Sequence, residues 1–143
     1  MELTAEIAAF RAGAGDPGRL VGEFRRAVLL VPRSGGSGDG EGGLMSALSG
    51  GIRWFYAFTD EGAMARFAEA RGEADREWPY LAILGARLAD AVVPEVGGPA
   101  GVAVNVADPE GSMMFPPVAG IVPDSCAVDV EAESGAGSAA GVV

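Results

Sequence analysis

The chain has 143 residues, the length of one ordinary domain, and hydrophobic residues make up 49% of it, which excludes a fully disordered protein. Acidic residues number 20 and basic residues 10, all of them arginine, so the net charge of −10 argues against nucleic-acid phosphates or an anionic membrane as partners. Histidine and lysine are absent and Cys126 is the single cysteine, which excludes His-based nucleophile activation, a Walker lysine, Cys/His zinc sites and internal disulfides.

The first residues and the hydrophobic runs bear on the location of the protein. Residues 1–6 carry acidic side chains where a secretory signal begins with basic ones. No run of about 18 or more apolar residues is present, so we expect no membrane-spanning helix. The single cysteine gives no sign of an oxidising compartment. The sequence therefore predicts a cytoplasmic protein.

Two helices and a strand open the predicted fold. Residues 4–12 predict a short helix with an apolar stripe. A second helix follows, with Asp16 as its N-cap and Pro17 in its first turn, where the missing N–H costs nothing. Residues 27–32 form an unbroken apolar run of strand length. Such a run favours a central strand that is covered on both faces.

Glycines mark the next loop and turn. Residues 34–43 include six glycines, which predicts a mobile loop because glycine loses the most conformational entropy on ordering. Gly50 and Gly51 are typical of a tight hairpin turn. The aromatic segment 52–58 after this turn is the strongest strand candidate of the chain.

The second half alternates helices and strands. A helix capped by Thr59 or Asp60 is expected to end at Gly72. The remaining expected elements are a strand over 78–84, a short helix over 86–92 stopped by Pro94, a strand over 102–106, a turn over 108–111 and a hairpin strand over 112–115. These elements predict a single α/β domain over residues 1–123, with a mixed sheet of about five strands and packed helices. Residues 124–143, rich in Gly, Ala, Ser and acids, are expected to form a disordered acidic tail.

Four segments carry a resemblance to a known family. They are Val28-Leu29-Leu30-Val31-Pro32, Trp54-Phe55-Tyr56-Ala57-Phe58-Thr59-Asp60-Glu61, Gly85-Ala86-Arg87-Leu88-Ala89-Asp90-Ala91 and Val102-Ala103-Val104-Asn105. In this order they resemble the SseB N-terminal domain family (enhanced serine sensitivity proteins). The family usually has proline and glycine after the last asparagine, whereas Val106 follows Asn105 here. The resemblance implies an α/β domain that serves association or regulation, without agreed catalytic residues.

Two glycine motifs match the Gly-x-Gly-x-x-Gly pattern of dinucleotide sites, at residues 13–18 and 38–43. No strand precedes the first motif. The second contains Asp39 and Glu41, whose charges would repel a pyrophosphate. We therefore expect no nucleotide and no other cofactor.

Carboxylates are the remaining source of chemistry, because two acids can act as an acid–base pair or bind a hard cation. Asp108 and Glu110 lie in a predicted turn, and no acids show a recognisable ligand spacing. Solvated surface is the simpler interpretation of these acids. The sequence thus predicts neither metal ligands nor catalytic residues, and a carboxylate enzyme is the weakest of three functional hypotheses.

The aromatic residues are the most informative feature. Alternation along a strand places Trp54, Tyr56 and Phe58 on one face, with Trp78 and Tyr80 on a neighbouring strand and Met114 extending the patch. One interpretation is that helices cover these rings and all of them are core. The other is an exposed patch that binds a partner, since Trp and Tyr are enriched at interfaces.

Two functional hypotheses follow from these aromatic residues. The leading one is a non-enzymatic protein-interaction or regulatory domain whose partner is an unknown protein, with a homo-oligomer left open. The alternative is a small-molecule-binding domain with an aromatic-lined pocket near Trp54 and Trp78.

Overall fold

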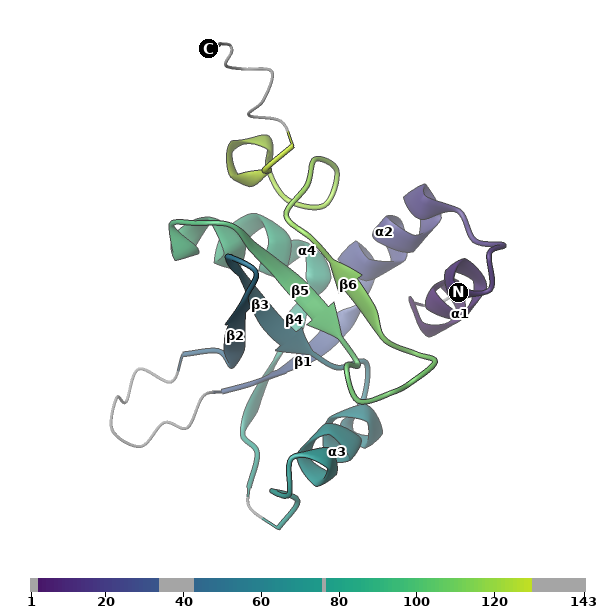
Figure 1. Ribbon diagram of the computed structural model, residues 1–143, viewed down its shortest axis with the longest axis vertical. Coiled ribbons are helices and arrows are strands. Elements are labelled where there is room, and N and C mark those ends of the chain that lie inside the picture. The colour runs from purple at the N-terminus through teal and green to yellow at the C-terminus, as the bar shows by residue number, and fades with distance from the viewer. Residues whose placement is uncertain (1–2, 34–42, 76, 130–143) are drawn as a thin grey trace.

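The computed structural model describes residues 3–33, 43–75 and 77–129 (Figure 1). In chain order its helices and strands are α1 (Leu3–Arg11), α2 (Pro17–Arg26), β1 (Val28–Pro32), β2 (Ser46–Ser49), β3 (Ile52–Ala57), α3 (Glu61–Ala70), β4 (Tyr80–Leu84), α4 (Gly85–Arg87), β5 (Ala100–Val104) and β6 (Met113–Phe115). A π-helical segment (Leu88–Val92) and a 3-10 turn (Val93–Val96) continue α4, and a second 3-10 turn (Asp124–Cys126) follows β6.

The strands form two sheets that are joined along β1. The larger sheet has the order β2-β3-β5-β6, with β3 and β5 parallel and the other pairs antiparallel. β1 and β4 pair antiparallel in the smaller sheet. Leu30 and Phe58 connect the two sheets by exchanging backbone hydrogen bonds of 2.8 and 2.9 Å. The predicted α/β fold with a mixed sheet is confirmed, with six strands among the described residues.

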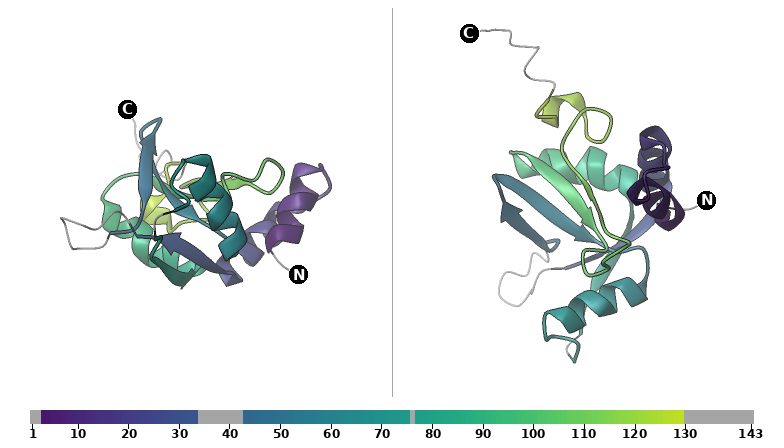
Figure 2. Two further views of the ribbon diagram at one scale, coloured as in Figure 1. Left: turned by 90° about the horizontal axis from the view of Figure 1, so that it is seen from below. Right: turned by 45° about the vertical axis from the view of Figure 1, so that its right-hand side comes forward.

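Helices cover the two faces of the larger sheet unequally. Side chains from α1, α2 and the α4 region pack against β3, β5 and β6 to form the main core, which includes Ile7, Leu20, Phe24, Phe55, Leu88, Val102, Val104 and Phe115. α1 lies beside α2 at one end of the molecule (Figure 2). On the opposite face, α3 supplies Ala63, Met64 and Phe67 to a smaller cluster around Phe58.

Capping and turn residues act where the sequence predicts them. The Asp16 carboxylate accepts a hydrogen bond from the Arg19 N–H at 3.0 Å at the start of α2. Asp60 caps α3 in the same way, accepting from the Ala63 N–H at 2.8 Å. Each such cap satisfies an N–H that has no partner inside its helix. The β2–β3 turn consists of Gly50 and Gly51, whose φ angles of 63° and 82° are those that glycine adopts without steric cost.

Two predictions about the ends of elements need correction. Pro94 does not stop the helix after Gly85, because it lies in the first turn of the 3-10 segment that continues it. The ordered chain also continues past the expected boundary at residue 123. Ala127 is only 5% exposed and packs into the main core, so residues 124–129 belong to the folded part. Most of the expected loop 34–43 and the tail from residue 130 lie outside the described residues.

Candidate functional site

Phe67 of α3 gathers three of the predicted binding residues into a core cluster. Its ring centroid lies 4.9 Å from that of Tyr56, 5.2 Å from that of Phe58 and 5.8 Å from that of Trp78. Phe58 is fully buried, which corrects its prediction as a binding residue. Tyr56 and Trp78 are partly buried against the same cluster. The core interpretation therefore holds for this end of the sheet.

Trp78 and Tyr80 both engage groups near α3. The Trp78 indole N–H donates to the Glu73 carbonyl oxygen at 3.0 Å. The Tyr80 hydroxyl donates to the Glu61 carboxylate at 2.7 Å, and this hydrogen bond raises the pKa of Tyr80 because it stabilises the protonated phenol. These contacts hold the start of β4 against α3.

Strand register brings a different set of apolar side chains to the same face of the sheet. Ala47 of β2 pairs with Trp54, Trp54 pairs with Gly101 of β5, and Met114 of β6 pairs with Ala103. Alternation along β3 directs Trp54 away from Phe55 and the main core. We call the partly or fully exposed apolar residues of this surface the Trp54 face: Ala47, Ile52, Trp54, Met114 and Pro116.

Gly101 lets the Trp54 indole lie close against the sheet. A Cβ at position 101 would meet Trp54 Cζ3 at 2.8 Å and the Phe115 carbonyl oxygen at 2.5 Å, closer than ordinary contact allows. The indole thus lies against the β5 backbone beside Pro116, whose Cα would be 3.2 Å from that Cβ. The strand neighbours of Trp54 on both sides, Ala47 and Gly101, are small.

No helix among the described residues lies over the Trp54 face. α3 packs on the end of the face that begins at Tyr56, and no helix crosses the front of β3 and β5 in Figure 1. Met114 is 48% exposed, and Trp54 is only partly buried. Of the predicted binding residues, Trp54 and Met114 thus share an accessible surface, whereas Tyr80 lies on β4 in the other sheet.

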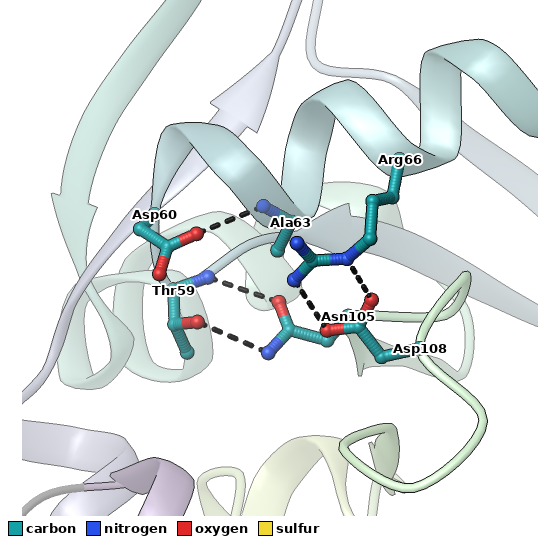
Figure 3. A network of polar contacts seen from close by, with 6 residues as sticks. All are labelled: Thr59, Asp60, Ala63, Arg66, Asn105 and Asp108. Carbon is teal, nitrogen blue, oxygen red and sulfur yellow. Dashed lines mark hydrogen bonds and ion pairs between the residues drawn. The ribbon is translucent and has the colours of Figure 1, made fainter.

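A polar network lies where the parallel strands β3 and β5 end (Figure 3). The Asn105 side chain is 2% exposed; its carbonyl oxygen accepts from the Thr59 N–H and its amide donates to the Thr59 hydroxyl, both at 3.0 Å. Asn105 has a φ of 51°, in the left-handed region that asparagine tolerates better than most residues. Sequence reasoning did not find this network, although an asparagine directly after a buried strand is the signal that indicates it.

An ion pair between α3 and the loop after β5 lies beside this network. Arg66 of α3 makes a two-pronged contact with Asp108, with Nε–O and N–O distances of 2.6 and 3.0 Å. The hydrogen bond to Asp108 raises the pKa of Arg66, since the carboxylate stabilises the guanidinium cation. Asp108 is therefore occupied by a structural partner, which weakens the carboxylate-enzyme hypothesis. Across the described part of the chain, no group of three or more Cys, Asp or Glu side chains is placed to hold a metal ion.

We predict that Asn105 stabilises the fold through both its amide and its φ. Asn105→Ala should lower the free energy of unfolding by roughly 2–3 kcal/mol, because the half-buried Thr59 N–H loses its acceptor and alanine is strained at this φ. Asn105→Gly loses the same bonds without the strain and should cost about 1 kcal/mol less than alanine. Urea unfolding of the two variants measures both terms. Equal costs would show that the φ carries no strain.

Several cavities open on the described surface. One of them, about 470 Å³, lies between the 3-10 segment 93–96 and residues 124–128, and includes the half-buried Cys126. A second, about 280 Å³, is lined by residues that include Thr59 and Asp60. A third, about 170 Å³, adjoins Trp78 and is lined by α3 residues, and Trp54 is not part of it. The two tryptophans therefore do not line a common pocket here.

Comparison of the chain with protein-family models, with curated proteins and with solved structures found no match. The resemblance to the SseB N-terminal domain family accordingly stays a prediction. None of the helices in the described ranges is both long and apolar enough to cross a membrane.

Proposed function

We propose that this chain is a non-enzymatic protein-interaction or regulatory domain and that its partner binds on the Trp54 face. The observation that supports this proposal is the half-covered sheet: α3 packs over the end of β3 that begins at Tyr56, while Trp54 and the 48%-exposed Met114 of the edge strand β6 are left accessible. A helix-free apolar surface around a tryptophan has the composition of an interface centre.

The charge of the chain indicates what surrounds the apolar contact on the partner. A net charge of −10 repels acidic proteins and attracts basic ones. We therefore propose a partner that presents apolar side chains to Trp54 within a basic rim. Association with such a partner should slow as the ionic strength rises, because salt screens the attraction between the two surfaces.

The alternative, a small-molecule-binding domain, has less support from the geometry. The cavity beside Trp78 has a volume of about 170 Å³, below the roughly 300–1,000 Å³ of typical ligand pockets. The cavity of about 470 Å³ has a suitable volume, but its lining residues include no aromatic side chain.

The test is a substitution that adds charge to the Trp54 face without touching a core. The tagged chain is used to capture proteins from its native cells, mass spectrometry identifies them, and binding is then measured with the purified partner by calorimetry. We expect Met114→Glu to weaken binding at least about tenfold, because a carboxylate would be desolvated within the contact. Trp54→Ala should weaken it similarly.

Leu48→Glu is the matched control. Leu48 is 65% exposed on the neighbouring strand β2, and its pairing with Arg53 places it on the opposite face of the sheet. The control should bind the partner like the unmodified chain. Equal binding by Met114→Glu and Leu48→Glu would contradict the proposal, as would a purified protein that captures no partner.

A further inference from the structure

β4 is an apolar strand at the edge of its sheet. It pairs with β1 on one side, and no described strand pairs with its other side. Its five residues, Tyr-Leu-Ala-Ile-Leu, carry no charge. Tyr80, Leu81 and Leu84 are 37%, 40% and 45% exposed. Sheet edges are usually protected by charged residues, proline or a covering segment, so a bare apolar edge indicates a surface that another strand covers.

The hydrogen-bond pattern shows which backbone groups of β4 face outward. Arg33 N–H donates to the Pro79 carbonyl and Gly85 N–H to the Ala27 carbonyl, both at 2.9 Å, so the odd-numbered residues of β4 bond to β1. In an antiparallel pair the groups of alternate residues point to opposite sides. The N–H groups of Tyr80, Ala82 and Leu84 and the carbonyls of Tyr80 and Ala82 therefore point away from β1.

We propose that β4 pairs antiparallel with β4 of a second copy of this chain, with the two Ala82 residues facing each other across a two-fold axis. Each Ala82 N–H then bonds the other Ala82 carbonyl, and each Leu84 N–H bonds the Tyr80 carbonyl of the other copy. The same register sets Leu81 beside Ile83 of the other copy and Leu84 beside its Tyr80. The exposed side chains of the edge become cross-strand pairs.

The charges that flank β4 are complementary under this symmetry. Glu77 precedes the strand and Arg87 follows it at the same distance in sequence from Ala82, and both are exposed. An antiparallel two-fold therefore brings the acidic end of one strand toward the basic end of the other. A second copy fits this edge in charge as well as in backbone geometry, and at physiological ionic strength screening over about 8 Å limits the repulsion between the two acidic chains.

The register allows a test in which two defective variants rescue each other. Ala82→Lys and Ala82→Glu each place like charges face to face at the axis, and each should raise the dimer dissociation constant at least about tenfold. Mixed in equal amounts, the two variants should form a heterodimer, because lysine then faces glutamate. Sedimentation velocity of the full chain up to millimolar concentration measures the mass of each sample.

Leu48→Lys on β2 is the control, because it adds the same charge to an edge strand of the larger sheet, and it should leave the dimer intact. Thermal melts followed by circular dichroism check that each variant is folded. An unmodified chain that stays monomeric, a dimer that survives Ala82→Lys, or a mixture that fails to associate would each overturn the proposal. β4 is separate from the Trp54 face: Met114→Glu should leave the dimer unchanged, and Ala82→Lys should leave partner binding unchanged.

Discussion

Gly85→Ala is expected to lower the free energy of unfolding by more than about 3 kcal/mol, the upper end of the cost of overpacking. Gly85 begins α4 and is buried where the end of α2 crosses it. A Cβ there would overlap the Phe24 carbonyl oxygen and lie 2.9 Å from its carbonyl carbon. Phe24 is fully buried and stacks on Phe115 with ring centroids 4.3 Å apart, so it has no room to move.

Gly98→Ala provides the matched control for this substitution. A Cβ on Gly98 would meet no atom within 4 Å, so the change should alter stability by less than about 0.5 kcal/mol. Guanidinium unfolding followed by circular dichroism compares the two variants. If Gly85→Ala proved as stable as the control, α2 and α4 would not approach each other as closely as the structure shows.

Phe58→Ala should cost about 3–5 kcal/mol of unfolding free energy, because it leaves a large cavity in the cluster under α3. The Phe58 ring is fully buried and packs on Phe67, and the Phe58 backbone pairs with Leu30 of the smaller sheet. Leu48→Ala, at a position 65% exposed, should change stability by less than about 0.5 kcal/mol. If Phe58→Ala kept its stability but lost partner binding, the burial of Phe58 would be contradicted and its prediction as a binding residue would stand.

Local signals in the sequence predicted much of the fold. The caps Asp16 and Asp60 and the Gly50-Gly51 turn depend on neighbours within a few residues, and the structure confirms them. The tail boundary was misplaced because the burial of Ala127 depends on a core formed by distant residues. The residue composition around Ala127 does not indicate that contact.

The sequence predicted which residues belong to the candidate site better than it predicted how these residues are arranged. Alternation correctly separates Trp54 from Phe55, since one packs into the main core and the other does not. It cannot distinguish Trp54 from Phe58, which share a face, because only the position of α3 decides which ring is covered. The exposure of β4 could not be predicted for the same reason. An apolar run indicates a buried strand whether or not a further strand pairs with it.

The pairing of β1 with β4 has a consequence for how the chain folds. β2 and β3 are joined by a two-residue turn, so this hairpin is expected to form within microseconds of collapse. The strand that pairs with the whole of β1 begins only at Tyr80, and such non-local pairings slow folding. On the ribosome, the apolar residues Leu29 and Val31 therefore emerge well before their partners. We expect closure of the smaller sheet to be the late, rate-limiting step, with β1 the segment most in need of protection until then.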